Sequence, residues 1–187
     1  EAKQPMKLFD MNIIHSHNFE EDLNIIEGYG NVEAYTSDDM LEDGSREKIG
    51  SCTYHIYNTS HFLHDQSLLM TADAISGDEL FMLDIIMNGE HEFQMTSDEM
   101  LAPIGHVFIE DKFDYYENEK LILQKLMAYF EYISLDYIAV IATKSESASR
   151  EKKSVISFPQ IKLYKTLGFE YLGGYEKKHQ VWIKNNN

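Results

Sequence analysis

The chain has 187 residues and a formal net charge of −16, with 43% hydrophobic residues, 12% aromatic residues and a single cysteine, Cys52. That length and apolar content are enough to bury a core, which excludes an intrinsically disordered protein. No apolar run approaches the ~18 residues of a membrane-spanning helix, and a lone cysteine excludes an internal disulfide. We expect one soluble, cytoplasmic α/β or α+β domain over residues 6–187, with Glu1–Pro5 as an added segment.

The acidic residues are concentrated in the first two-thirds of the chain. Residues 1–120 carry 26 Asp and Glu against 6 Lys and Arg, a balance of −20, whereas residues 121–187 carry 6 against 10, a balance of +4. Such a field repels nucleic acids and anionic membranes and attracts basic protein surfaces. It therefore predicts a basic protein partner, with no direct contact to nucleic acid or membrane. The alternative is that the charge serves solubility alone.

The N-terminal half carries weak periodic patterns. Apolar residues at helical spacing predict a helix over Asn18–Glu27. β-rich runs and a polar break predict a strand at Lys7–Ile14, a loop at Ser37–Lys48, and strands at Ile49–Tyr57 and Phe62–Thr71.

A helix start is signalled at Ser76. Ser76 followed three residues later by Glu79 forms a capping box, in which the hydroxyl accepts from a backbone amide and the carboxylate reaches back to the cap. The following apolar face predicts a helix over Gly77–Met87 that stops at Gly89. A short strand at His91–Met95 and a turn at Thr96–Met100 should follow.

The C-terminal third has the clearest pattern, in the order strand, helix, strand, helix and paired strands. A continuous apolar run at Tyr137–Ala142 is typical of a strand buried on both faces, and Gly168 is placed to end a helix. The expected elements are strands at Ile104–Phe113 and Tyr137–Ala142, helices at Glu117–Ile133 and Pro159–Leu167, a mobile basic loop at Lys144–Ser157, and strands at Phe169–Tyr175 and His179–Ile183.

This order, with the segments "LYKTLGFEYLGG" and "VFIEDKFDYYENEKLILQKLMAYFEY", resembles the GNAT superfamily of acyl-CoA-dependent N-acetyltransferases. Tyr164, Leu167, Gly168 and Phe169 match the family's YxxLGF helix end, and the resemblance covers residues 104–184. It implies a single GNAT-like domain with a central mixed, mostly antiparallel sheet flanked by helices.

The resemblance also implies a place for the cofactor pyrophosphate. In the family, a Q/R-x-x-G-x-G/A turn after the fourth strand binds it with backbone amides at a helix start. The corresponding residues in this chain are Asp114, Tyr115, Tyr116, Glu117, Asn118 and Glu119. Glu117 stands at a glycine position, and the carboxylates would repel pyrophosphate. Acids also stabilise a helix N-terminus in their ordinary role, and both statements can hold together.

Three residues are candidates for chemistry. Tyr164 falls where many members of the family place a tyrosine that protonates the departing thiolate of coenzyme A, although a tyrosine on a helix face is also a common packing residue. Glu110 and His106, both in the run expected to form the strand, are candidate general bases, because a base must lie within hydrogen-bond reach of the amine. Either could equally be an ordinary surface residue.

Two histidine pairs invite a metal interpretation. They are His15 with His17 and His61 with His64. Neither pair has a third ligand at a suitable spacing, so we expect no metal site.

Two main hypotheses follow. The first is a GNAT-fold protein with a degenerate acetyl-CoA site and no cofactor, which binds a basic partner through its acidic surface as an inhibitor or decoy of, for example, a nucleic-acid-binding protein. The second is an active acetyl-CoA-dependent N-acetyltransferase acting on a cationic amine or a lysine-containing substrate. A third is a structural or regulatory subunit that forms a homodimer through exposed aromatic residues.

Overall fold

The structure is a computed structural model that describes residues 8–37, 42–143, 145–147, 155–157, 160–175 and 179–186, the side chains of 145–147 and 155–157 excepted. Its elements are β1 (Phe9–Glu20), β2 (Ile25–Tyr35), β3 (Glu47–Asn58), the 3-10 helix η1 (Thr59–His61), α2 (Asp65–Ile75), α3 (Gly77–Asn88), β4 (Met100–Ile109), α4 (Tyr116–Tyr132), β5 (Tyr137–Thr143), β6 (Ser145–Ser147), β7 (Val155–Ser157), α5 (Gln160–Thr166), β8 (Glu170–Tyr175) and β9 (His179–Asn185).

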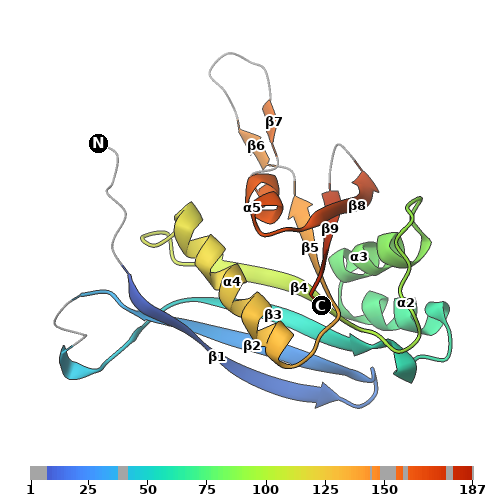
Figure 1. Ribbon diagram of the computed structural model, residues 1–187, viewed down its shortest axis with the longest axis horizontal. Coiled ribbons are helices and arrows are strands. Elements are labelled where there is room, and N and C mark those ends of the chain that lie inside the picture. Colours follow the sequence, from blue (N-terminus) through green and yellow to red (C-terminus); the bar gives the residue numbers. More distant parts are fainter. Residues whose placement is uncertain are drawn as a thin grey trace.

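Seven strands form one mixed sheet in the order β1-β2-β3-β4-β5-β9-β8, and β6 pairs with β7 in a separate two-stranded hairpin. Within the sheet, every neighbouring pair is antiparallel except β4 and β5, which are parallel. The crossover between these parallel strands is α4, which lies across the N-terminal strands in Figure 1. The prediction of a mixed, mostly antiparallel sheet flanked by helices is confirmed.

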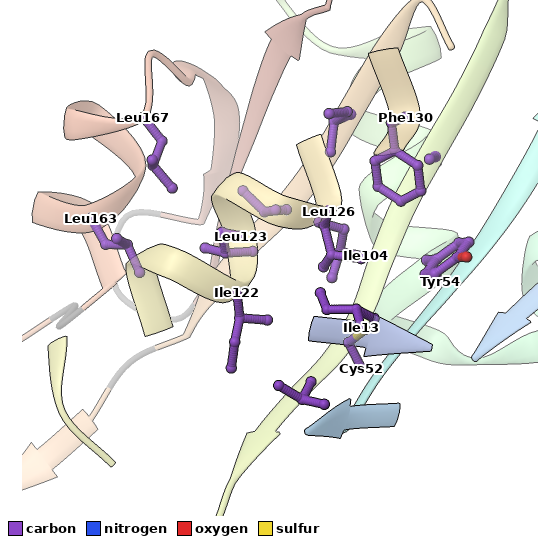
Figure 2. Close-up of a cluster of buried hydrophobic side chains, with 14 of the residues drawn as sticks. Ile13, Cys52, Tyr54, Ile104, Ile122, Leu123, Leu126, Phe130, Leu163 and Leu167 are labelled. Carbon is purple, nitrogen blue, oxygen red and sulfur yellow. The ribbon is translucent and has the colours of Figure 1, made fainter. Parts of the chain in front are cut away.

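The two faces of the sheet bury separate cores. Alternation along β3 sends Cys52, Tyr54 and Ile56 into the cluster that includes Ile122 and Phe130 of α4. Figure 2 shows these α4 side chains facing the sheet, with Leu163 of α5 and Leu167, which follows α5, nearby. Tyr57 of β3 instead belongs to a second cluster, formed with residues of α2 and α3. The long helix and the helix pair therefore pack on opposite faces.

The Tyr54 ring depends on a glycine in the neighbouring strand. Gly28 pairs with Tyr54 across β2 and β3, and a Cβ at Gly28 would lie 2.0 Å from the Tyr54 ring. Any side chain there would displace a fully buried aromatic residue. The close approach explains why a glycine occupies the middle of a long strand, where glycine otherwise weakens pairing.

The predicted elements with strong periodicity are confirmed to within a few residues. The predictions for β3, α3, α4, β5, α5, β8 and β9 all match the observed elements, whereas β4 starts and ends four residues earlier than expected. Gly89 caps α3, and Gly168, with a φ of +81°, follows the end of α5 in the left-handed conformation that favours glycine.

Three predictions for the weakly patterned regions are wrong. Asn18–Glu27 is not a helix, because it contains the end of β1, a tight turn and the start of β2, with Asn24 in the left-handed region at a φ of 59°. Phe62–Thr71 is not a strand; α2 occupies most of it, and the His64 side chain caps this helix by accepting from the Ser67 amide. His91–Met95 forms no strand.

Two predicted loops lie partly outside the described residues. These are Ser37–Lys48, of which residues 38–41 are not described, and Lys144–Ser157, whose described part holds only β6 and β7. The added segment Glu1–Pro5 also lies outside them. No described helix has the length and apolar content needed to cross a bilayer.

Candidate functional site

A groove opens where the two parallel strands of the sheet diverge. The parallel pairing joins Leu101–Pro103 of β4 to Tyr137–Ala139 of β5, and both strands then continue for several residues. A cavity of about 330 Å³ lies between the diverging parts. Its polar lining side chains are Asp78, His106, Glu119, Thr143, Gln160 and Tyr164. The sheet therefore provides a cleft at its centre without any loop insertion.

Two of the three predicted catalytic residues line this groove. Tyr164, on α5, is 8% exposed, and its hydroxyl donates to the Ile141 carbonyl oxygen at 3.0 Å. Burial, with the nearby charge of Glu119, raises the pKa of Tyr164 well above its ordinary value. His106 reaches the same groove from β4. The structure thus brings together a phenol and an imidazole, the latter solvent-exposed.

Glu110 does not line the groove. It follows the end of β4 at Ile109, and its carboxylate lies 3.6 Å from the ammonium of Lys112. Its backbone amide donates to the Ile49 carbonyl oxygen, which fixes the chain beside β3. Its surroundings match an ordinary surface carboxylate.

The N-terminus of α4 borders an adjoining pocket of about 490 Å³ whose charged lining is entirely acidic. Asp111, Asp114 and Glu119 line it, together with Gln160, and no described lysine or arginine does. Burial and the neighbouring charge of Asp114 raise the pKa of Glu119 above its ordinary value. Carboxylates thus surround the helix end at which anions otherwise bind.

The other residues of the predicted cofactor turn have different surroundings. Tyr115 is the N-cap of α4 but makes no side-chain capping hydrogen bond. The Tyr116 hydroxyl donates to Thr166 Oγ1 at 3.2 Å, which ties α4 to α5. Glu117 is exposed, and Asn118 donates its side-chain amide to the Phe113 carbonyl oxygen at 2.8 Å. Of the six, only Asp114 and Glu119 line the pocket.

A buried polar network on the opposite face was not predicted. Glu79, only 2% exposed, accepts a hydrogen bond from the Tyr57 hydroxyl at 2.6 Å, and its other oxygen lies 2.8 Å from His55 Nδ1. The Ser76 hydroxyl accepts from the Glu79 amide as expected, so half of the capping box is confirmed. The other half is wrong, because the carboxylate turns inward to β3 rather than back to the cap.

The Glu79 network makes the stability contributed by His55 depend on pH. Burial alone would lower the pKa of His55, but the hydrogen bond and charge of Glu79, assisted by Glu27, raise it above 6.5. The stabilisation is fully present below the unfolded-state pKa and is lost as pH rises through the higher folded-state pKa. It amounts to about 1.4 kcal/mol for each unit by which folding raises the pKa.

Urea unfolding of the protein and of a His55→Gln variant checks the prediction. It is repeated at pH values from below the unfolded-state pKa of His55 to above its folded-state pKa. The difference between the two isolates His55 from His15, whose pKa is lowered by burial and which acts in the opposite sense. We expect the stability advantage of the unmodified protein to shrink as pH rises. An advantage that stays constant or grows contradicts the assignment.

No metal centre is found in the part of the chain that the structure describes, where no three His, Cys, Asp or Glu side chains are placed to hold a metal ion. His15 and His17 do share a face of β1, with stacked rings 6.2 Å apart. Both bond to the Tyr54 hydroxyl, at 2.8 and 2.9 Å. The Tyr129 hydroxyl also lies 3.0 Å from His17 Nε2. The two imidazoles therefore bond to tyrosine hydroxyls.

Comparison with known proteins gives likenesses of structure. No protein-family model matches the sequence, and no curated protein matches it. The structure is similar to Arabidopsis thaliana NAA60 in complex with a bisubstrate analogue (TM-score 0.46, 13% identity, 86% of this chain and 75% of that one). It is also similar to a mosquito arylalkylamine N-acetyltransferase-like protein (0.48, 10%, 84% and 74%) and to the AHL synthase LasI (0.49, 9%, 96% and 91%).

At such identities the likeness concerns the fold alone. The order of elements from β4 to β9, with a parallel pair that diverges in the middle of a mixed sheet, is the one that the resemblance of residues 104–184 implied. The chain is an α/β protein with a seven-stranded mixed sheet flanked by helices, as the sequence predicted.

Proposed function

We propose that this GNAT-like protein acts by binding a basic protein partner through its acidic surface and does not use acetyl-CoA. The observation that supports this most directly is the acidic lining of the pocket at the start of α4, formed by Asp111, Asp114 and Glu119. An acyl-CoA bound as the resemblance implies would place its pyrophosphate at this helix start.

The energetic argument rests on charge. A carboxylate and a phosphate charge about 4 Å apart repel by roughly 1 kcal/mol in water and roughly 4 kcal/mol where the site is partly shielded. Glu119 is half-buried, so part of this repulsion is poorly screened. Asp111 and Asp114 are exposed.

The same charges favour a basic partner. With a balance of −20 over residues 1–120, the protein presents a field that raises the association rate of cationic surfaces and weakens as salt is added. A protein that normally binds nucleic acid offers such a surface, which would make this chain an inhibitor or decoy of that partner.

Isothermal titration with acetyl-CoA tests the first half of the proposal. We expect no heat of binding up to millimolar ligand, and micromolar affinity would overturn the proposal. Association with a lysine-rich peptide over a salt series tests the second half. We expect affinity to fall as salt rises and on neutralising Asp114, Glu117 and Glu119; affinity indifferent to both would argue against the proposed surface.

One observation favours a second function. His106 and Tyr164 line one groove, where an imidazole and a phenol could act as general base and general acid in acetyl transfer to a cationic amine or a lysine-containing substrate. A steady-state assay with acetyl-CoA and a polyamine tests this alternative. Turnover that is lost in Tyr164→Phe would establish it, whereas the binding function predicts no turnover in either protein.

A further inference from the structure

A third cavity, of about 500 Å³, lies on the side of the sheet that carries α2 and α3. It is lined by β1, β2 and β3 residues that include Ser16, Asn18, Glu27, Thr53 and His55, with Ile75 at the end of α2. None of its described lining residues lines the groove between β4 and β5. It is therefore a separate candidate site.

The Glu79 network fixes the state of the imidazole at this pocket. An ionised carboxylate can only accept hydrogen bonds, so the 2.8 Å contact with Glu79 places a proton on His55 Nδ1. In the neutral ring, Nε2 then carries a lone pair and acts as an acceptor. The His55 side chain is 15% exposed, and Glu79 behind it is 2% exposed, so the ring is anchored from the protein interior.

A second acceptor stands beside this nitrogen. Glu27 Oε1 lies 3.9 Å from His55 Nε2, too far for a direct hydrogen bond. The separation lets one donor nitrogen lie about 2.9 Å from both atoms. The Glu27 side chain is 47% exposed, so its carboxylate meets the pocket from the solvent side.

The charges around the pocket favour a cation. Glu27 and Glu79 bring two negative charges, against at most one positive charge on His55. No described lysine or arginine lines the pocket, and the neighbouring Lys48 ammonium lies 3.1 Å from the Tyr29 hydroxyl, to which it donates.

We propose that this pocket binds a primary ammonium group, with Glu27 as its counter-ion and His55 Nε2 as its second acceptor. The three N–H donors of an alkylammonium can satisfy both acceptors and one hydroxyl, such as that of Thr53. The alkyl stem would lie along Ile75 and the Tyr29 ring. The inference is independent of acetyl-CoA, because the pocket shares no described lining residue with the groove.

Binding of the ammonium should compete with protonation of His55. The titratable groups around the ring are Glu27 on β2, Glu79 on α3 with its Tyr57 donor, and Tyr29 at the pocket wall. His17 also lines the pocket, but its imidazole bonds to Tyr54 and Tyr129 on the α4 side of the sheet. A proton on Nε2 removes the acceptor, so affinity should fall as pH falls through the His55 pKa. The alkylamine itself keeps its charge to about pH 10.

The test is a titration of isotope-labelled protein with n-butylamine at several pH values between about 7 and 9.5, because folding raises the pKa of His55 while the alkylamine stays charged over this range. The imidazole nitrogen resonances of His55 report binding. We expect a saturable shift of Nε2, and a Glu27→Gln variant should weaken binding by about 10-fold, as loss of a charge-assisted hydrogen bond does. N-butylacetamide, with the same stem and no charge, should give no shift.

The matched control is Glu33→Gln, the same change on the same strand but outside the pocket. It should alter affinity by no more than about twofold, because Glu33 lies several residues along β2 from the pocket and its effect there is screened. Lysine blocked at its α-amino and α-carboxyl groups is titrated in parallel with n-butylamine, to distinguish a lysine side chain from a small free amine as the ligand. Tighter binding of either one supports the proposal. An absent shift, an equal effect of both variants, or an equal response to the uncharged probe would overturn it.

Discussion

Replacing Glu79 with alanine should lower the free energy of unfolding by about 3–5 kcal/mol, the cost typical of breaking a buried charged pair. The carboxylate is 2% exposed and is the acceptor for both His55 and Tyr57. Its removal leaves a buried phenol and a largely buried imidazole without their partner, and also leaves a cavity beneath α3. Urea unfolding at neutral pH measures the loss.

Asp84→Ala is the matched control, because Asp84 lies on the same helix and its exposed side chain accepts a hydrogen bond from Asn88. It should change stability by no more than about 0.5 kcal/mol. A double-mutant cycle with His55→Ala should give a coupling energy of about 1.5–3 kcal/mol. Additive effects of the two substitutions would show that the His55 contact contributes little to stability.

Neutralising the pocket at the start of α4 should have the largest effect on ligand binding. The triple variant Asp111→Asn, Asp114→Asn and Glu119→Gln should gain at least about 100-fold in affinity for coenzyme A, since each carboxylate repels the pyrophosphate by roughly 1 kcal/mol or more. The helix N-terminus would then be free to act as an anion site. Isothermal titration over a salt series measures the gain.

A second triple variant, Glu90→Gln, Glu92→Gln and Asp98→Asn, makes the same change of net charge in the segment between α3 and β4. None of its residues lines the α4 pocket, so it should gain little. An equal gain in both variants would assign the effect to net charge rather than to the pocket. A lack of gain in the first would mean that the backbone shape, without glycines, closes the site.

The sequence predicted the C-terminal fold well because its signals are local. The apolar stripe of α4 repeats over 17 residues, and β5 is a continuous buried run. In the N-terminal half, Phe19, Leu23 and Ile26 matched a helical spacing, yet this segment bends back at Asn24 to pair two strands. Strand pairing is a tertiary contact, and it overrode a weak local pattern.

The candidate site residues likewise divide into those that a local sequence signal indicates and those whose partners lie far away in the sequence. Tyr164, named through the motif resemblance, and His106, named only as a residue of the expected strand, both line the groove, whereas Glu110 lies outside it because β4 ends one residue before it. Glu79 was read only as part of a cap, since its partners on β3 lie 22 and 24 residues earlier in the chain. Alternation along β3 places His55 and Tyr57 on one face, which is the signal that could have found them.

Because β4 and β5 diverge, each of them has a strand edge that borders the groove in the middle of the sheet rather than an outer edge of the sheet. Past Pro103 and Ala139, each strand keeps its outer neighbour, so peptide groups on its inner edge border the groove. One of them, the Ile141 carbonyl, already accepts a hydrogen bond from a side chain. An extended guest could be recognised there by its main chain, through groups that every amino acid carries. Recognition of this kind can survive extensive replacement of the side chains around it.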